Sequence, residues 1–573
     1  MARYHEKILP LAPAIILLIF AFILAFSPWN IGERELAWRE GFVVAQSWGM
    51  DIAPLPLVKA HGMAIPNAQP LFPLLVSGIQ ALGCPPEIAG RVLSLLGLLG
   101  LTAVVFAVTY QTRRNVSAAA CAGAMMLTTL LMIDKAPDGF AHTLFVLIIL
   151  TGHLLWYYFA AIRGNWSQAW AVGFGCCAVG FYMQGIDAVI YFMLPLIFMR
   201  RPLGIFQHLS CRGMFAGLGI LAAVTLLWYL PYSFDGVQIS QIYPQADWMG
   251  NWEYLLHLLC FPLDLALRLM PWALLAWVPF CVAFQTLDET PIFSRFLRTL
   301  FLADFFLLWA GPLDDSYAMM ILVPPLAMMT GLNYELAVRR YGNFYRRLSN
   351  VAAGILLPFS GVALLVFFLL PTDFFIGFFD LERSLDFSDN PGRTVLGVTS
   401  GLMLLVVGAA LWKLREKPPI WCYWLIIACA PLLIYSNVVL PYQALDRPRQ
   451  LRGELLKHVL RQENIPQNSV IYKYDLYDLY SESVYMNYPV QKIDSLTALP
   501  KSEVQTVYVF SKSFPNLPER TWRSLLPEPL SARGNKFNLW RGEWQQQSEE
   551  PVTRQQSPLL EVIKDAPVGR EGF

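Results

Sequence analysis

A short charged stretch, residues 29–40, follows the first long apolar run and gathers the residue types that acid–base chemistry needs. It holds three glutamates and two arginines within a few residues. Charged groups at a membrane surface lose part of their hydration, so their pKa values depend strongly on their neighbours. The spacing of Glu33, Ala37 and Glu40 predicts a short helix that presents them on one face. An ion-paired turn at the membrane surface is the alternative, and the surrounding elements decide between the two.

The composition places those surrounding elements in a membrane. Of the 573 residues, 56% are hydrophobic and only 14% are charged, whereas a soluble domain averages about 25% charged residues. Apolar runs long enough to cross a bilayer recur until about residue 441. The first run lacks a small-residue cleavage site and is interpreted as a retained anchor. The net charge of +1 gives no argument for nucleic acid, and we expect no nucleic-acid partner.

The charges between the apolar runs predict the orientation of the chain. Arginine and lysine cluster in alternate loops, which the positive-inside rule assigns to the cytoplasm. This phase fits an odd number of spans, with the N-terminus in the cytoplasm and the C-terminal region outside. Thirteen spans are predicted, near residues 8–27, 90–111, 116–133, 139–162, 167–183, 186–199, 213–232, 268–286, 296–311, 318–337, 350–371, 394–414 and 420–441.

The predicted transmembrane domain comprises residues 1–444, with two long external loops, 28–89 and 233–267. Acidic residues gather in these loops, and the second is also rich in aromatic residues. Within the first loop, residues 71–82 are apolar but too short to span, so we expect a helix lying in the interface.

After the last span the sequence becomes polar. Residues 445–544 predict a small α/β domain outside the membrane, with strands near 469–472 and 504–510 and a helix over 451–462. The region 545–573 is rich in Gln, Glu and Pro, which is typical of a disordered tail.

Several short motifs follow one another in an order that resembles a known family. After the acidic stretch come Asn67–Pro73, Gly90-Arg91 at the second span, Asp138 at the fourth, and Gln184-Gly185; later segments are Arg268–Trp272 and Tyr317 with Val323–Pro325. The series resembles the GT-C superfamily of polyprenyl-phosphate-dependent glycosyltransferases, and within it the branch of the lipid A aminoarabinose transferases (ArnT) and the protein O-mannosyltransferases.

The resemblance implies a mainly α, polytopic membrane protein of about thirteen transmembrane helices with an external C-terminal α/β domain. It also implies transfer of a sugar from a polyprenyl-phosphate donor to a lipid, glycan or protein acceptor at the external face, by a single inverting displacement. The implied location is the inner (plasma) membrane of a bacterium, where membrane lipids surround the protein.

Three positions depart from the family pattern. Gly32 stands where the family has aspartate, Ala68-Gln69-Pro70 replaces Lys-Pro-Pro, and Asp314-Asp315 occupies the place of a lysine. Gln184 also replaces the lysine of the family's Lys-Gly. Either the geometry of donor and acceptor has shifted, or the activity is lost.

Such a transfer needs a carboxylate base and cations that hold the leaving phosphate. Glu33 is the first candidate base and Asp138 the second, although Asp138 could instead cap the N-terminus of the fourth span. The candidates for binding phosphate or substrate are Arg34, Lys59, Arg91, Arg268 and Tyr317.

No cofactor is required by this chemistry, although a divalent metal could assist it. His61 and His257 are the candidate ligands, and a solvated external histidine is the alternative for each.

Two other classes of function stay open. A lipid or sugar transporter or flippase would favour ionisable residues in mid-span and symmetry between the halves of the chain. A catalytically silent GT-C-like scaffold would explain the three departures.

Overall fold

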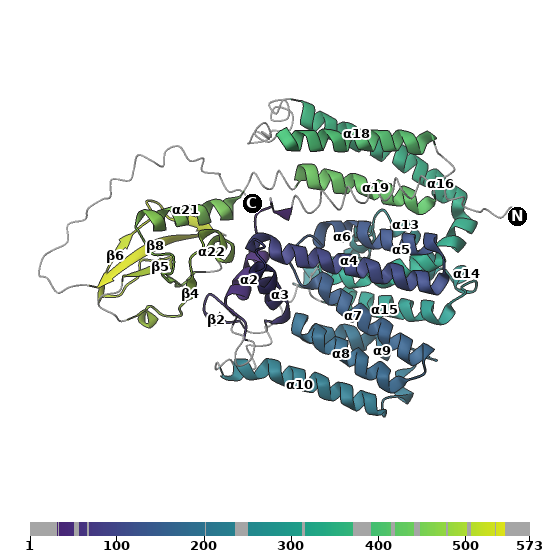
Figure 1. Ribbon diagram of the computed structural model, residues 1–573, viewed down its shortest axis with the longest axis horizontal. Helices are drawn as coiled ribbons and strands as arrows, with labels where there is room; N and C mark the ends of the chain where they lie inside the picture. Colours follow the sequence, from purple (N-terminus) through teal and green to yellow (C-terminus); the bar gives the residue numbers. More distant parts are fainter. Residues whose placement is uncertain are drawn as a thin grey trace, which may run out of the picture. The chain divides into compact units, whose positions relative to one another are not determined.

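The computed structural model describes most of the chain, in two compact units that are treated separately below (Figure 1). The membrane unit comprises residues 1–35, 52–57 and 66–446, and the α/β unit comprises 36–51, 58–65 and 447–573. The described residues are 31–32, 34–50, 57–65, 68–200, 202–234, 250–311, 316–370, 391–413, 419–439, 447–476, 479–500, 506–532 and 534–544.

The described part of the membrane unit is helical, as lipid requires, because a helix satisfies its own backbone hydrogen bonds. Its α-helices are α3 (Leu71–Ala81), α4 (Pro86–Arg113), α5 (Val116–Thr128), α6 (Leu130–Lys135), α7 (His142–Tyr157), α8 (Trp166–Gln184), α9 (Ile186–Ile197), α10 (Arg212–Phe234), α12 (Asn251–Arg268), α13 (Ala273–Ala276), α14 (Val282–Gln285), α15 (Pro291–Ala310), α16 (Val323–Leu369), α18 (Pro391–Lys413) and α19 (Ile420–Ile434). Short 3₁₀ or π segments are η1 (Tyr158–Ile162), η2 (Ile205–Gln207), η3 (Val278–Phe280), η4 (Ala318–Leu322) and η5 (Tyr435–Val439).

This helical architecture confirms the predicted class of a polytopic membrane protein. Among the described residues, six helices are long and apolar enough to cross a membrane, or seven if a bent pair counts as one span. Three shorter apolar helices, α3, α5 and α9, accompany them. The first predicted span, 8–27, lies outside the described residues, and the count of thirteen is not confirmed.

One predicted cytoplasmic loop is a helix instead. The spans expected at 318–337 and 350–371 belong to one continuous path, in which η4 leads into the 47-residue helix α16. The intervening segment is rich in arginine, and charge alone does not end a helix. It contains no proline and only one glycine, so nothing in its sequence interrupts the backbone hydrogen bonds.

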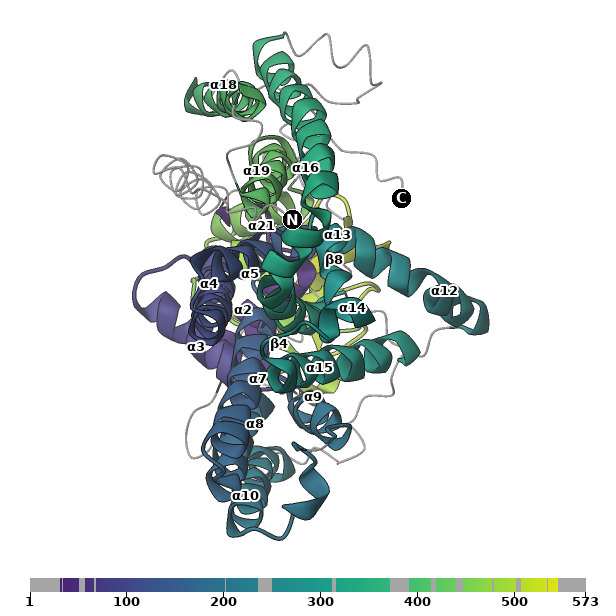
Figure 2. The ribbon, with the colours of Figure 1, turned by 90° about the vertical axis from the view of Figure 1, so that its right-hand side faces the viewer.

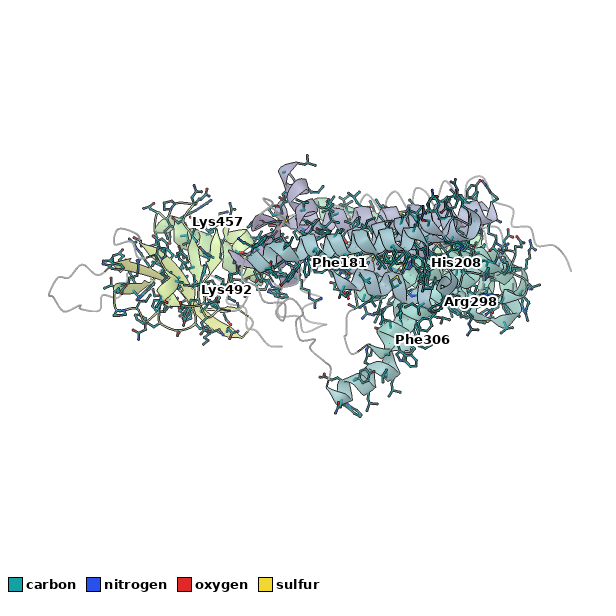
Figure 3. The ribbon with its side chains drawn as sticks, turned by 90° about the horizontal axis from the view of Figure 1, so that it is seen from below. Phe181, His208, Arg298, Phe306, Lys457 and Lys492 are labelled. Carbon is teal, nitrogen blue, oxygen red and sulfur yellow. The ribbon has the colours of Figure 1, made fainter. Side chains whose placement is uncertain are left out.

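The span expected at 268–286 is also wrong as a single helix. The chain turns by 111° between α12 and the segment that begins with α13, close to Pro271, and continues through η3 and α14. Proline lacks the amide hydrogen that helix propagation needs. Figure 2 shows α12 extending away from the other helices of the membrane unit. In Figure 3 the labels Phe181, His208, Arg298 and Phe306 mark the same unit.

The α/β unit contains a mixed sheet with the strand order β4-β3-β5-β8-β6, and β7 pairs with β8. The strands β3 and β5, near the two predicted ones, run parallel, and β8 is antiparallel to β5. Helices α21 and α22 complete the unit, and a buried core that includes Leu456, Ile471, Phe510 and Leu539 fills it. Lys457 and Lys492 mark this unit in Figure 3. The bounds are α21 (Pro448–Gln462), α22 (Tyr480–Met486), β3 (Ile471–Lys473), β4 (Val490–Lys492), β5 (Val507–Ser511), β6 (Arg520–Ser524), β7 (Leu530–Ala532), β8 (Asn535–Trp544) and the 3₁₀ segment η6 (Leu496–Ala498).

Part of the first predicted external loop belongs to the α/β unit, not to the transmembrane domain as expected. Helix α2 (Trp38–Trp48) and the hairpin of β1 (Lys59–Ala60) and β2 (Met63–Ala64) are its contributions. The amide of Leu36 donates to the Tyr485 hydroxyl at 2.8 Å, and Leu36 packs with Val44 and Val484. Apolar contacts with α22 therefore fix this part of the loop.

The short helix expected from Glu33 to Glu40 begins later, at Trp38. Glu40 accepts a hydrogen bond from the Ala37 amide at 2.9 Å, so its carboxylate caps the helix start. Capping of free N–H groups by a glutamate in the first turn is a common way to begin a helix. Glu40 is thus committed to the fold of the α/β unit.

Candidate functional site

The membrane unit brings Asp138 together with two other predicted site residues. The Asp138 carboxylate lies 2.5 Å from Arg34 Nη2 through one oxygen and accepts a hydrogen bond from the Tyr317 hydroxyl, at 2.6 Å, through the other. Its side chain is only 11% exposed. Residues far apart in the sequence thus form one centre, called the Asp138 centre below.

Asp138 is not the cap of the fourth predicted span. Helix α7 begins at His142 with Ala141 as its N-cap, and Asp138 lies in the preceding turn. The backbone amide of Phe140 donates to the Asp138 carbonyl at 2.8 Å. The carboxylate is therefore available for side-chain contacts from other elements.

Two further side chains border the Asp138 centre. Lys135, at the end of α6, places its ammonium 5.2 Å from the centroid of the Tyr317 ring and 3.1 Å from Asp134. Tyr435, at the start of η5, lies near Arg34 and Asp138. One buried carboxylate thus has two cations in its neighbourhood, a combination that stabilises negative charge on a bound ligand.

The backbone around Arg34 is held by Arg91 of α4. The Arg91 guanidinium is 1% exposed and donates to the carbonyls of Ile31, Arg34 and Glu35. The preceding residue, Gly90, approaches the carbonyl of Gly139 so closely that a Cβ there would lie 3.2 Å from it. The start of α4 therefore supports both turns that carry the Asp138 centre.

A cavity of about 190 Å³ adjoins this centre, because Tyr317 contributes to both. The described residues that line the cavity come from the segment before α3, from α7, from the end of α8, from α9 and from the segment at the start of η4. They are Gln69, His142, Phe145, Val146, Gln184, Asp187, Tyr191, Tyr317, Ala318 and Ile321.

Local backbone features place the polar lining residues. The Ala68 carbonyl accepts hydrogen bonds from Trp228 Nε1 at 3.1 Å and from the Tyr232 hydroxyl at 2.9 Å, which fixes the chain next to Gln69. At the α8–α9 turn Gly185 has φ +67°, a conformation that side chains disfavour. This sharp turn brings Gln184 and Asp187 to the same cavity.

The two long external loops differ in what they contribute to this cavity. Gln69 of the first loop lines the cavity, but none of the described residues 250–267 of the second loop does. Arg268, at the end of α12, pairs with Asp264 at 2.8 Å. His257 Nε2 lies 3.3 Å from the Leu308 carbonyl.

Two other candidates, Lys59 and His61, lie in the α/β unit. His61 is buried, and its ring nitrogens lie 3.0 Å from Ser483 Oγ and 3.3 Å from Lys473 Nζ. Burial, and secondarily the charge of Lys473, lower the pKa of His61 to about 3. Both nitrogens thus have protein partners, which makes His61 unsuited to bind a metal.

Two positions that the sequence singled out cannot be placed in the site. Glu33 and the Asp314-Asp315 pair are outside the described residues. Within the described part of the chain, no group of three or more His, Cys, Asp or Glu side chains could hold a metal.

Sequence reasoning assigned no role to His142, Tyr191 or Lys135. A signal for Lys135 was present, because it precedes Asp138 by three residues. Asp187 follows Gln184 by the same interval, which places both at one helix-to-helix turn. His142 is the first residue of the apolar helix α7, Tyr191 lies within the apolar helix α9, and neither has a distinctive spacing.

The fold is similar to that of two solved structures of ArnT from Cupriavidus metallidurans. The structure bound to undecaprenyl phosphate has a TM-score of 0.63 at 15% identity, and the apo structure a TM-score of 0.64 at 14% identity. Each comparison covers 92% of this chain and 98% of the other. No family model and no curated protein sequence matches the chain. The similarity confirms the expected ArnT-like membrane fold.

Proposed function

We propose that this protein is a membrane glycosyltransferase that moves a sugar from a polyprenyl-phosphate donor to a lipid, glycan or protein acceptor. The observation that carries the proposal is the Asp138 centre, in which a buried carboxylate with adjacent cations contacts Tyr317, a residue that lines a cavity. A structure with this fold holds undecaprenyl phosphate, which supports the choice of donor.

In the proposed reaction the acceptor oxygen attacks the anomeric carbon of the sugar. The bond between that carbon and the phosphate oxygen breaks, with inversion, and the acceptor proton passes to the carboxylate of Asp138. The donor phosphate carries one negative charge and leaves with two, so cations that contact it stabilise the transition state more than the ground state.

Arg34 and Lys135 are the cations that we assign to the leaving phosphate. Arg34 is paired with Asp138 when no donor is bound. A phosphate that draws the guanidinium toward itself leaves the carboxylate with less neutralising charge, which makes it a stronger base. Donor binding would therefore activate the base, whereas Tyr317 keeps the carboxylate oriented.

Glu33 is the alternative base, because it directly precedes Arg34 in the chain. The two assignments are separated by measuring consumption of a polyprenyl-phosphate-linked sugar in membranes that contain wild type, Asp138→Asn or Glu33→Gln. We expect the Asp138 variant to lose turnover. Loss in the Glu33 variant alone would transfer the role of base to Glu33, and no consumption above background in the wild type would favour a catalytically silent scaffold.

The reaction is proposed to occur at the external face of an inner (plasma) membrane. The distribution of arginine and lysine supports a cytoplasmic N-terminus and an external α/β unit. Reporter fusions after Arg347 and after Arg452 test this orientation, with the cytoplasm expected for the first and the exterior for the second. The same side for both would contradict it.

A further inference from the structure

The arginine-rich segment of α16, residues 335–350, forms part of the helix and exposes its charges. It contains four arginines and one glutamate. The ion pair that the described residues form within it joins Arg339 to Glu335, at 3.6 Å. Arg340 and Arg347 are both exposed, and neither forms an ion pair with a described residue. Because seven residues are about two helical turns, these two arginines lie on one face of α16.

The same face of α16 becomes apolar beyond Arg347. Val351, Ile355 and Phe359 follow it at four-residue intervals, and residues at this spacing stack along one side of a helix. Their side chains are 58%, 62% and 72% exposed. They belong to a helix that is apolar and long enough to cross a membrane, so lipid chains cover them. One unbroken helix therefore carries two cations and a lipid-facing apolar stripe in line, and these five residues, with Arg340, are called the α16 ridge below.

Trp412 of α18 marks the depth of this ridge in the bilayer. Its indole ring packs against Gly354 of α16, where a Cβ would lie 3.4 Å from the ring. Trp412 is 59% exposed, and such tryptophans concentrate where lipid chains meet the head groups. Arg347 precedes Gly354 by seven residues, about 10 Å along the helix axis. Arg347 therefore lies on the aqueous side of that boundary, where the lipid head groups are.

The two arginines keep their charge available for a ligand. The Arg340 guanidinium lies 5.7 Å from the centroid of the Phe284 ring and 5.6 Å from that of Tyr341. These aromatic contacts hold the side chain without neutralising it. Lys413, the last residue of α18, adds a positive charge next to Trp412. Since an arginine fork matches the oxygens of a phosphate, this end of the ridge suits an anion held at a membrane surface.

We propose that the α16 ridge binds one anionic phospholipid, with its phosphate at Arg340 and Arg347 and an acyl chain along the apolar stripe. A zwitterionic lipid fits less well, because its own ammonium group lies close to the arginines and is repelled. None of the residues of the ridge lines the cavity beside the Asp138 centre. The proposal therefore goes beyond the proposed function and does not depend on it.

The test uses two lipids that share their acyl chains and differ in the charge of the head group. The purified full chain in detergent micelles is given equal amounts of phosphatidylglycerol and phosphatidylcholine, and the lipids that stay bound are counted by native mass spectrometry. We expect wild type to bind phosphatidylglycerol at least tenfold more tightly, since each arginine at an anionic lipid surface contributes about fivefold. Equal binding of both lipids would overturn the proposal.

Two kinds of variant locate the source of this preference. Arg347→Gln should reduce it by about fivefold, and Arg340→Gln combined with Arg347→Gln should remove most of it. Replacement of both arginines by lysine keeps the two charges and should retain the preference. Arg347 has no ion pair to lose, so its single variant keeps the test decisive if the double variant does not fold. An unchanged preference in the folded glutamine variants would overturn the proposal.

The matched control is Arg163→Gln combined with Arg212→Gln, which removes two exposed arginines of the membrane unit that do not belong to the ridge. It should leave the preference intact, and an equal loss would show that only total charge matters, against the proposal. Inorganic phosphate in large excess should not displace phosphatidylglycerol, because it has no chain to contact the apolar stripe. Displacement would show a site for free anions and would also contradict the proposal.

Discussion

Two buried clusters of ionisable side chains, one in each unit, look alike as lists of residues but differ in their surroundings. In the membrane unit, Asp138 contacts Arg34 and Tyr317 and borders a cavity through Tyr317. In the α/β unit, His61 contacts Lys473 and Ser483, and no described residue of this cluster lines that cavity.

The hydrogen bonds of the His61 cluster form a chain that ends in the backbone. The Ser483 hydroxyl donates to the Tyr480 carbonyl at 2.7 Å, so its oxygen accepts from His61 Nε2. His61 Nδ1 then accepts from the Lys473 ammonium, which also lies 5.0 Å from the centroid of the Tyr480 ring. Because the Ser483 hydroxyl proton is donated to a backbone carbonyl and not to His61, the histidine does not activate this serine as a nucleophile.

The comparison teaches that partners, more than burial, separate a site from a structural network. The Asp138 centre holds charged groups that a ligand phosphate can recruit, next to a cavity of about 190 Å³. The His61 cluster satisfies its members internally, as buried polar groups usually are. The predictions below test this contrast.

The largest effect is expected for Asp138→Asn. Loss of a positioned base should lower turnover of a polyprenyl-phosphate-linked sugar by about a hundredfold or more, while the protein still folds. His61→Gln in the other cluster should leave turnover within about threefold of wild type. Turnover that falls equally in both variants would remove the distinction between the two clusters.

Removal of a cation from the Asp138 centre should have the next largest effect. Lys135→Gln should weaken binding of undecaprenyl phosphate by about tenfold, because a hydrogen bond to a charged group contributes about 1.5–3 kcal/mol. Arg268→Ala is the informative comparison, since Arg268 pairs with Asp264 and belongs neither to the Asp138 centre nor to the described lining of the cavity. If the same assay shows a larger loss of affinity for undecaprenyl phosphate in Arg268→Ala than in Lys135→Gln, Arg268 binds the phosphate, as the sequence predicted.

The next prediction concerns Arg91, whose guanidinium holds the backbone of the turn that carries Arg34. Arg91→Met should lower turnover of a polyprenyl-phosphate-linked sugar by severalfold, because the carbonyls that hold the turn of Arg34 lose their donors. The control is Arg113→Met at the other end of α4, whose guanidinium donates to the Leu332 carbonyl. If both variants lower turnover to the same extent, Arg91 acts only through the stability of the helix.

The sequence predicted much of this fold, because apolar length and charge are local properties. The juxtamembrane helix expected at 71–82 is α3, and most long apolar runs are helices close to their predicted bounds. The failures have physical causes. A polar, arginine-rich segment remained helical within α16 because no residue breaks it, and proline broke the span expected at 268–286.

The site was harder to predict because it depends on contacts between distant segments. Asp138, Arg34 and Tyr317 were all candidates, but the sequence could not show that they meet. Arg91 was expected at a phosphate, whereas the structure shows it beneath the turn of Arg34, with three carbonyl acceptors. A lone arginine at a helix start does not reveal whether its partner is a ligand or a backbone.

The smallest predicted effect concerns stability and pH in the α/β unit. The pKa of His61 is about 3 in the folded protein, below its ordinary value of about 6.5 in an unfolded chain. The unfolded state therefore binds more protons between these values, so this group's stabilising contribution is complete above pH 6.5 and is lost as the pH falls toward 3. His61→Gln should flatten the decline in melting temperature between pH 7 and pH 4 relative to wild type. His458→Gln removes an exposed histidine from α21 of the same unit and should leave that decline unchanged. An equally steep decline in His61→Gln would show that other groups control acid unfolding, and would leave the His61 cluster without the structural role that separates it from the Asp138 centre.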